Sequence, residues 1–330
     1  MLNGKTILIT GGTGSFGNAF TEYVLTHYEP QKIIIYSRDE FKQFNMANKF
    51  KQYKDKLRFF IGDVRDKERL YRAFDGVDYV VHAAALKQVP SCEYNPMEAV
   101  KTNINGAMNI VDAALDCGVK RVVALSTDKA VNPINLYGGT KLVSDKLFIA
   151  ANAYAGAKDV CFSIVRYGNV AGSRGSVIPF FQNIVANGGK ELPITDYRMT
   201  RFWISLKEGV QLVIKALGEA KGGETFISKI PSFKITDLAQ AILPGCKMPE
   251  VGIREGEKLH EIMVTREDSL FTYEYDKHFI VYPHFEWWNT SKIQEGGKRV
   301  ESGFEYSSGK NTEWLSVEQI QQLLKSVREH

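Results

Sequence analysis

The sequence predicts an α/β protein built on a doubly wound parallel sheet, followed by a smaller C-terminal substrate lid. Three observations lead to this fold class. Short β-branched runs alternate with longer helical patterns over the first 170 residues. Several runs are almost continuously apolar, such as Ile33–Ile35 and Val122–Leu125, as strands are when helices cover both sheet faces. A glycine-rich segment follows the first run, at the sheet edge where such folds bind ligands.

The elements divide the chain into two parts. Beyond residue 170 the sequence is rich in Gly, Pro and aromatic residues, with helical stretches at Leu206–Gly218 and Thr236–Leu243. From about residue 300 we expect a surface tail that ends in an amphipathic helix, Val317–Val327. We expect a dinucleotide-binding domain over residues 1–170, to which some later segments return, and a mainly substrate-binding domain with the tail over residues 171–330. The expected strands are Lys5–Thr10, Lys32–Ser37, Leu57–Gly62, Asp78–His82, Arg121–Ser126 and Val160–Tyr167.

Composition excludes several classes of protein. The 330 residues are 44% apolar and 24% charged, which is enough to bury a core and excludes a disordered chain. The four cysteines are scattered and no apolar stretch has the length of a membrane helix, so we expect a cytoplasmic protein without a membrane partner. The net charge of +4 is spread along the chain, which gives no reason to expect nucleic acid. The six histidines lack metal-binding spacing, and no metal is expected.

The segment after the first expected strand predicts a dinucleotide site. Gly11, Gly14 and Gly17 stand at three-residue spacing and open a helical pattern. Such glycines allow a tight turn, a close approach to a pyrophosphate and close packing of helix on strand. The residues between them belong to the same expected site: Thr13, Ser15 and Phe16.

The end of the second strand favours NADP over NAD. It reads Ser37-Arg38, and a hydroxyl followed by a guanidinium suits a ribose 2′-phosphate better than the acidic residue that NAD requires. Asp39 and Glu40 follow, and their alternative role is to cap the next helix. The further residues of the expected cofactor site are Lys42, Asp63, Val64, Ala84, Lys87, Tyr137, Lys141 and Val170.

A reactive group follows the fifth strand. That strand leads into Thr127-Asp128-Lys129, and Tyr137 and Lys141 come shortly after it at i and i+4. A helix puts this tyrosine and lysine on one face. An ammonium beside a phenol favours the phenolate, so Tyr137 is a candidate base.

Taken together, these motifs resemble those of the extended short-chain dehydrogenases/reductases. Within that superfamily, 4-epimerases hold small residues after the fifth strand, and 4,6-dehydratases that retain C5 hold Asp-Glu. Asp128-Lys129 instead resembles the UDP-N-acetylglucosamine 4,6-dehydratases that invert C5, which begin the pseudaminic acid route used in flagellin glycosylation. Similar stretches cover most of residues 5–265. The resemblance implies a Rossmann-type sheet, bound NADP, UDP-N-acetylglucosamine as substrate and a homo-oligomer, often a hexamer.

The resemblance also implies catalytic roles. Tyr137 takes the proton of the sugar 4-hydroxyl, Lys141 holds the phenolate and the ribose, and Thr127 hydrogen-bonds O4. Neutral Lys129 then takes the C5 proton, and protonated Asp128 donates to the departing 6-hydroxyl.

Substrate contacts are expected on both sides of the site. Lys87 follows the fourth strand, and Asn169 lies past the sixth at a position that resembles a sugar-nucleotide contact of the superfamily. Arginines of the lid supply the planar fork that a diphosphate requires. The expected substrate contacts are Lys87, Tyr137, Asn169, Arg174, Thr195, Arg201, Arg254 and Glu257.

Two other functions stay open. A UDP-N-acetylhexosamine 4-epimerase would use Tyr137 and Lys141 but leave C5 untouched. A non-catalytic NADP-binding regulator would keep the cofactor site alone.

Overall fold

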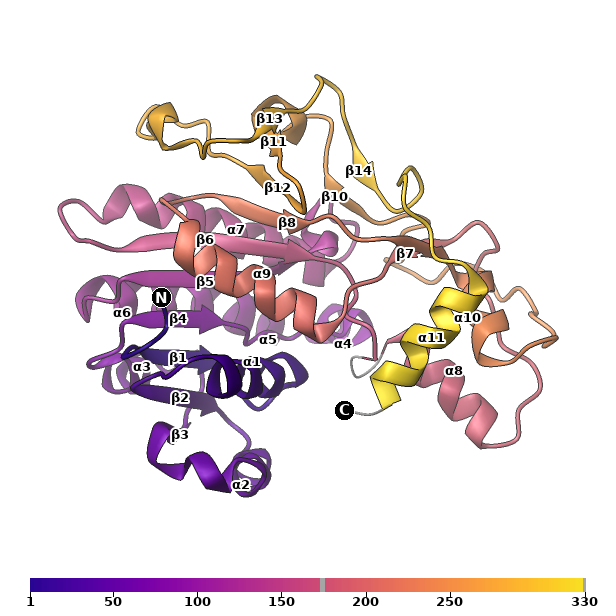
Figure 1. Cartoon of the computed structure of the whole chain (residues 1–330), viewed down its shortest axis with the longest axis horizontal. Coiled ribbons are helices and arrows are strands. Elements are labelled where there is room, and N and C mark those ends of the chain that lie inside the picture. The colour runs from indigo at the N-terminus through magenta and orange to yellow at the C-terminus, as the bar shows by residue number, and fades with distance from the viewer. Residues whose placement is uncertain (173–175, 329–330) are drawn as a thin grey trace.

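One sheet runs through the computed structural model, which describes residues 1–172 and 176–328, and within this part the sheet has ten strands (Figure 1). Their order is β13-β11-β12-β8-β6-β5-β4-β1-β2-β3. β1 to β6 and β8 are parallel, and the chain reverses direction across the sheet between β1 and β4, which confirms the doubly wound prediction. The strands are β1 (Thr6–Thr10), β2 (Lys32–Ser37), β3 (Leu57–Ile61), β4 (Tyr79–His82), β5 (Arg121–Thr127), β6 (Cys161–Tyr167), β8 (Thr225–Ser228), β11 (Thr272–Glu274), β12 (His278–Val281) and β13 (Lys298–Arg299).

Helices cover both faces of the sheet, which explains the apolar strands. Ile7 and Ile9 of β1 pack in the core beneath α1 and α9, whereas Leu8 points to the opposite core beneath α3, α6 and α7. Successive strand residues face opposite sides, so every position of such a strand is buried. The helices are α1 (Ser15–His27), α2 (Glu40–Lys49), α3 (Lys67–Phe74), α4 (Val89–Tyr94), α5 (Pro96–Val100), α6 (Gly106–Asp116), α7 (Leu136–Tyr154) and α9 (Leu206–Glu219).

A third core lies beyond the carboxyl ends of the parallel strands. It joins α8 (Val177–Ala186), α10 (Ile235–Ile242) and α11 (Val317–Arg328), which group together at one end of the molecule (Figure 1). A small antiparallel pair of β7 (Thr200–Phe202) with β9 (Ser232–Lys234) contributes Phe233 to this core. A second pair, β10 (Ile262–Val264) with β14 (Tyr306–Ser307), packs instead in the core beneath α1 and α9.

The expected elements of the first half match the structure to within one residue at each end, and the expected helices at 206–218, 236–243 and 317–327 are present. The prediction of a surface tail is wrong. Tyr306, Ser307 and Ser308 are buried, and β14 pairs with β10. The two serines form hydrogen bonds with other protein groups rather than with solvent. The polar sequence of this stretch therefore did not indicate a buried strand. Sequence reasoning also missed α8.

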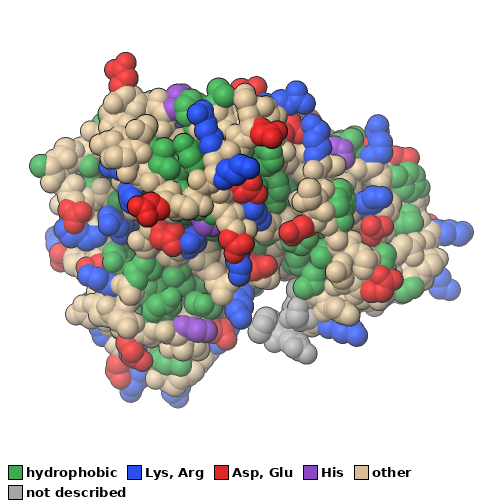
Figure 2. All heavy atoms as spheres, turned by 45° about the horizontal axis from the view of Figure 1, so that its top comes forward, with side chains coloured by type: hydrophobic (Ala, Val, Ile, Leu, Met, Phe, Trp, Pro, Cys, Tyr) green, Lys and Arg blue, Asp and Glu red, His purple; other side chains and the backbone are tan. Residues whose placement is uncertain are grey.

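Basic and acidic side chains are interspersed over the face shown in Figure 2. Among the described residues, none of the helices is long and apolar enough to span a membrane.

Candidate active site

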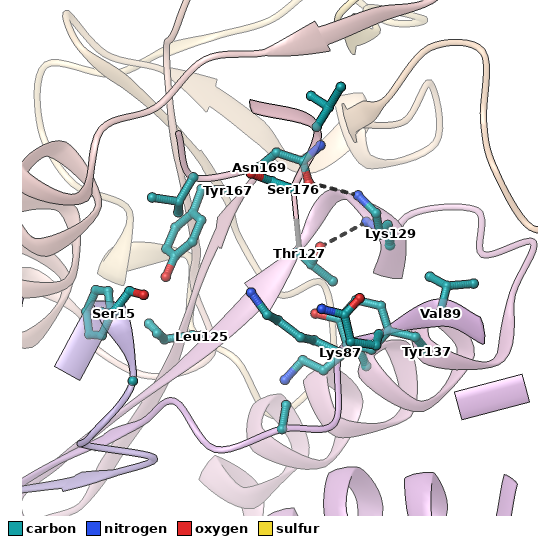
Figure 3. A pocket seen from close by; sticks show the side chains of 18 of the residues that line it. Ser15, Lys87, Val89, Leu125, Thr127, Lys129, Tyr137, Tyr167, Asn169 and Ser176 are labelled. Atoms are coloured by element: carbon teal, nitrogen blue, oxygen red, sulfur yellow. Dashed lines mark hydrogen bonds between the residues drawn. The ribbon is translucent and has the colours of Figure 1, made fainter. Parts of the chain in front are cut away.

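A cavity of about 1030 Å³ opens at the carboxyl ends of the parallel strands. Small-molecule sites typically enclose about 300–1,000 Å³, so this one has room for more than one ligand. Its walls include residues after β1, β2, β4, β5 and β6 and residues from the lid core. Lys87, Thr127, Lys129 and Tyr137 lie around this space (Figure 3).

The glycine-rich segment forms a cradle for a dinucleotide. Gly11 has a φ of +64°, and a Cβ there would lie 2.9 Å from the Ala84 backbone. Gly14 caps α1 without a side-chain hydrogen bond, which leaves backbone amides available to an anion. A Cβ on Gly17 would lie 2.1 Å from the Gly12 carbonyl oxygen, so Gly17 brings helix and turn together. The predicted residues that line the cavity here are Gly11, Thr13, Gly14, Ser15, Phe16 and Ala84.

Cationic groups stand at the end of β2. Arg38 lines the cavity, and its guanidinium lies 3.5 Å from the Asp63 carboxylate. The Asp39 carboxylate accepts a hydrogen bond from the Lys42 amide at 2.9 Å and pairs with the Lys42 ammonium at 2.7 Å, so it caps α2. In the described chain, two residues of the expected cofactor site do not line the cavity: Glu40, which starts α2, and Gly17, which lies in the first turn of α1. Ser37 and Val64 line the cavity near these groups, and Val170 lines it from the segment after β6.

α7 presents the tyrosine and the lysine one turn apart. The Asn135 side chain caps the helix by accepting a hydrogen bond from the Gly138 amide at 2.8 Å. A Cβ on Gly138 would lie 2.1 Å from the Lys129 carbonyl oxygen, so this glycine lets the first turn of α7 approach the Asp128-Lys129 segment. Both Tyr137 and Lys141 line the cavity.

Burial acts against ionisation on α7. It raises the pKa of Tyr137 to about 12, although the Lys129 charge and a hydrogen bond with Thr127 work in the opposite direction. Burial also lowers the pKa of Lys141, against the effect of the Asp145 carboxylate. The phenol is therefore protonated in the free protein, and the ammonium is easier to deprotonate than an ordinary lysine.

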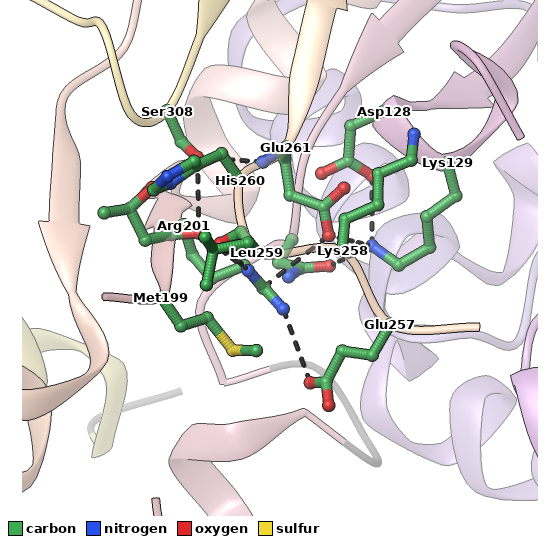
Figure 4. A network of polar contacts seen from close by, with 12 residues as sticks. Asp128, Lys129, Met199, Arg201, Glu257, Lys258, Leu259, His260, Glu261 and Ser308 are labelled. Carbon is green, nitrogen blue, oxygen red and sulfur yellow. Dashed lines mark hydrogen bonds and ion pairs between the residues drawn. The ribbon is translucent and has the colours of Figure 1, made fainter. Parts of the chain in front are cut away.

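Lys129 lies at the centre of a network that we call the Lys129 cluster: Asp128, Lys129, Asn169, Arg201 and Glu261 (Figure 4). The Lys129 Nζ lies 3.1 Å from Asp128 Oδ1, 3.2 Å from Asn169 Oδ1 and 3.2 Å from Glu261 Oε1. Arg201 Nε lies 3.6 Å from the same oxygen of Glu261. The cluster therefore joins the end of β5, the segment after β6 and two segments of the second half.

The charges of the cluster contradict the expectation of a neutral Lys129. Burial lowers the pKa of Lys129, but the carboxyl groups of Asp128 and Glu261 outweigh it and hold the pKa above its ordinary value. For Asp128, burial and then the Glu261 charge raise the pKa. For Glu261, burial is outweighed by Lys129 and Arg201, so its pKa is lowered. In the free protein the pKa values of Asp128 and Lys129 are therefore raised and that of Glu261 is lowered, although the three groups lie side by side.

The two members of the Asp128-Lys129 pair differ in access. Lys129, Thr127 and Glu261 line the cavity, whereas Asp128 is absent from the lining in the described chain and is completely buried. The Thr127 hydroxyl donates to Asp128 Oδ1 at 2.9 Å and connects it to the cavity. A Cβ on Gly168 would lie 3.1 Å from Asp128 Oδ2, so only glycine leaves room there.

Most of the expected substrate contacts line the same cavity. The Arg254 guanidinium lies over the Phe180 ring at 5.9 Å, and Arg201 NH2 lies 3.4 Å from Glu257 Oε1. Arg174 falls outside the described residues. The expected contacts that line the cavity are Lys87, Tyr137, Asn169, Thr195, Arg201, Arg254 and Glu257.

Sequence reasoning missed several polar residues of the site. Asn103 holds the loop before Lys87 by bonding both backbone groups of Leu86 at 2.9 Å, and it donates to Thr140 on α7 at 3.0 Å. Glu261 was not predicted as a partner of Lys129, although it lies within residues 5–265, most of which resemble the dehydratases. In residues 1–172 and 176–328 no group of His, Cys, Asp or Glu could hold a metal ion.

The fold and the site define an enzyme of the extended short-chain dehydrogenase/reductase type. Residues 7–283 match the family described as polysaccharide biosynthesis protein, and the chain belongs to that family.

Relatives and solved structures agree with this assignment. The chain is 56% identical over 326 residues to a UDP-N-acetylglucosamine 4,6-dehydratase (inverting) of Campylobacter jejuni, covering 97% of each chain. It is 43% identical to a UDP-glucose 4-epimerase of Rickettsia canadensis, covering 98% of this chain and 96% of that one. Pen from Bacillus thuringiensis superposes with a TM-score of 0.90 at 37% identity, covering 99% of both chains. DesIV, a dTDP-glucose 4,6-dehydratase from Streptomyces venezuelae, shares the fold with a TM-score of 0.68 at 24% identity, over 77% of this chain and 86% of that one.

Proposed function

We propose that the protein is a UDP-N-acetylglucosamine 4,6-dehydratase that inverts C5, a hydro-lyase whose product is UDP-2-acetamido-2,6-dideoxy-β-L-arabino-hex-4-ulose. The observation that carries the proposal is Lys129, which faces the cavity opposite Tyr137 with Asp128 behind it. A 4-epimerase needs no acid and base at C5 and C6, so this pair distinguishes the two reactions. The identity of 56% to the inverting dehydratase, against 43% to the epimerase, supports the same choice.

The first step is oxidation at C4. A dinucleotide held by the segment of Gly11 and Gly14 would supply the hydride chemistry, with C4 as the donor and C6 as the final acceptor. Tyr137 is the base for the proton of the 4-hydroxyl, but its phenol must first lose its own proton, which burial opposes. The Lys141 ammonium favours the phenolate and holds the ribose. Thr127 hydrogen-bonds O4 from the neighbouring wall of the cavity.

The second step is loss of water across C5 and C6. The 4-ketone makes the C5 proton acidic, and Lys129 removes it. Asp128 supplies the proton for the departing 6-hydroxyl, since burial raises the pKa of this carboxyl. In the free protein the Thr127 hydroxyl donates to Asp128 Oδ1 at 2.9 Å, so Thr127 must turn to accept the Asp128 proton as it passes its own proton to the sugar. Reprotonation of C5 on the opposite face gives inversion.

The cofactor is NADP. Ser37, Arg38 and Lys42 supply a hydroxyl and two cations at the cavity wall where a ribose 2′-phosphate would lie. Asp39 is engaged in capping α2, which leaves it unsuited to bind the 2′-hydroxyl of NAD. Mass spectrometry of the nucleotide released from denatured protein tests this assignment, and release of the unphosphorylated form alone would contradict it.

The sugar nucleotide binds across the lid. Arg254 and Lys87 offer cations to its diphosphate, and Asn169 and Thr195 offer polar contacts to the sugar and nucleoside. The remaining proposed contacts are Tyr137, Arg174, Arg201 and Glu257. The product suits the first step of pseudaminic acid biosynthesis in the cytoplasm, and the family resemblance supports a homo-oligomer, with a hexamer as the expected form.

Proton NMR in deuterated water tests the reaction. The purified protein is incubated with UDP-N-acetylglucosamine without added coenzyme. A new C6 methyl signal, deuterium at C5 and the couplings of an inverted ring are expected. Appearance of UDP-N-acetylgalactosamine alone, without deuterium, would assign the protein as an epimerase instead. If the sugar is not altered at all, the alternative of a non-catalytic NADP-binding regulator is favoured.

A further inference from the structure

Lys129 starts in the wrong charge state for a base. To take the C5 proton its amine must be neutral, yet carboxyl groups on two sides stabilise the ammonium. Its third partner, the Asn169 amide oxygen at 3.2 Å, accepts a hydrogen bond but cannot accept a proton. Asp128 is a poorer acceptor, because its Oδ1 already accepts from both Lys129 and the Thr127 hydroxyl and, in the described chain, the residue does not line the cavity. Among the described partners, Glu261 remains as the proton acceptor.

Glu261 is held rigidly at the right place. Its amide donates to Ser308 Oγ at 2.9 Å, and its carbonyl accepts from the Ser308 amide at 2.8 Å. The side chain is 3% exposed, with Oε1 3.2 Å from Lys129 Nζ and 3.6 Å from Arg201 Nε. In the described chain, Oε2 is buried without a hydrogen-bond partner although the residue lines the cavity. Asp128 Oδ2 also lacks a partner among the described residues, but of the two only Glu261 lines the cavity. Because Lys129 and Arg201 lower the pKa of Glu261, the proton resides on it only transiently, and its unused oxygen can take that proton without breaking existing contacts.

We propose that Glu261 is a positioning residue that takes the ammonium proton of Lys129 and thereby makes Lys129 the base at C5, an inference that rests on the proposed function. One N–H bond of Lys129 breaks, its electron pair stays on Nζ, and an O–H bond forms on Glu261. The C5–H bond then breaks, the proton moves to Nζ, and its electron pair enters the C4 carbonyl as an enolate. Two protons leave the 4-hydroxyl and C5, and two are delivered, one by Asp128 to O6 and one by Lys129 to C5. The site returns to its starting state when Glu261 gives its proton back to Lys129 and Tyr137 gives its proton to Asp128 through the Thr127 hydroxyl.

The test is Glu261→Gln, which keeps the shape and can still hydrogen-bond Lys129 but cannot take its proton. With UDP-N-acetylglucosamine, kcat should fall about a hundredfold while KM stays within about twofold. Because C4 oxidation does not use Glu261, absorbance of reduced nicotinamide should build up during turnover. Substrate deuterated at C5 should show a larger kinetic isotope effect on kcat than with wild type, since removal of the C5 proton becomes slower.

Two further variants separate this role from a structural one. Glu261→Asp keeps the carboxylate and should recover about tenfold of the lost kcat. Glu305→Gln removes a different ion-paired carboxylate of the second half, 3.0 Å from Lys310, and should match wild type. A Glu261→Gln kcat near that of wild type, or loss of C4 oxidation in parallel with product formation, would overturn the inference. If wild type itself forms no 6-deoxy sugar, the proposed function fails first, and the inference falls with it.

Discussion

Lys129 and Lys141 line the same cavity but are tuned in opposite directions. Lys141 has one carboxyl neighbour, Asp145, whose own pKa burial raises, and burial leaves the pKa of Lys141 below its ordinary value. Lys129 has two carboxyl neighbours within 3.2 Å, and its pKa lies above its ordinary value. One residue type thus gives two functions: a cation that stabilises a phenolate, and an ammonium that must pass on its proton before it can act.

The two surroundings also differ in origin. Tyr137, Lys141 and Asp145 all belong to α7, so a single helix sets their spacing. The Lys129 cluster is assembled from segments up to 132 residues apart in the chain. Its electrostatics therefore depend on how the second half packs over the sheet.

Removal of Lys141 should have the largest effect, because every later step depends on oxidation at C4. Lys141→Met is expected to lower the rate of product formation about 10⁴-fold. No reduced nicotinamide should appear on mixing with UDP-N-acetylglucosamine, as followed by stopped-flow absorbance. A normal burst of reduced nicotinamide in this variant would show that Lys141 is dispensable for C4 oxidation.

Removal of Lys129 should separate the two halves of the reaction. Lys129→Met is expected to reduce 6-deoxy product about 10³-fold while C4 oxidation still occurs. The reduced nicotinamide should persist, and the sugar should take up no deuterium at C5 in deuterated water. Loss of both signals together would mean that the two lysines act as one unit.

Neutralising Asp145 should have a moderate effect confined to the α7 side. Asp145→Asn keeps an acceptor for the Ser126 hydroxyl, which lies 2.5 Å away. It removes the charge that raises the pKa of Lys141, so the alkaline limb of kcat should move to lower pH and kcat should fall about tenfold. A pH–rate profile identical to that of wild type would exclude this coupling.

The smallest effect concerns the free energy of unfolding and its dependence on the charge of His82, a buried residue close enough to Lys141 to be affected by its charge. Burial and then the Lys141 charge lower the His82 pKa from 6.5 to about 3. The unfolded chain binds the proton first, so this contribution to stability is complete above about pH 6.5 and is lost as the pH falls toward 3. Between about pH 7.5 and pH 5 the loss amounts to about 2 kcal/mol.

His82→Asn should abolish that part of the acid sensitivity. Thermal unfolding of both proteins at the two pH values measures it, and buried carboxyl groups such as Asp145 and Glu224, which act with the opposite sign, cancel in the comparison. The variant loses some stability at neutral pH as well, because His82 Nδ1 and Thr10 Oγ1 lie 2.8 Å apart in a hydrogen bond. Equal acid sensitivity in both proteins would contradict the prediction.

The sequence predicts well what arises locally. The strands, the glycine-rich turn and the one-turn spacing of Tyr137 and Lys141 depend on neighbours within a few residues, and the structure has all of them. The charge state of Lys129 depends on Glu261, which no local pattern connects to it. The buried strand at Tyr306–Ser307 was hidden for the same reason, since its partner β10 lies far earlier in the chain. Capping of α2 by Asp39 was an open alternative, and only the geometry decides for it.

The bonds between Ser308 and Glu261 also determine when the protein becomes competent during its synthesis. The sheet and α7 can form while the rest of the chain is still being made, because N-terminal units fold first. Ser308 is synthesised 47 residues after Glu261. A nascent chain can therefore form its cofactor pocket before Ser308 has emerged, but the proton-transfer site is held in place only once that residue has joined the fold.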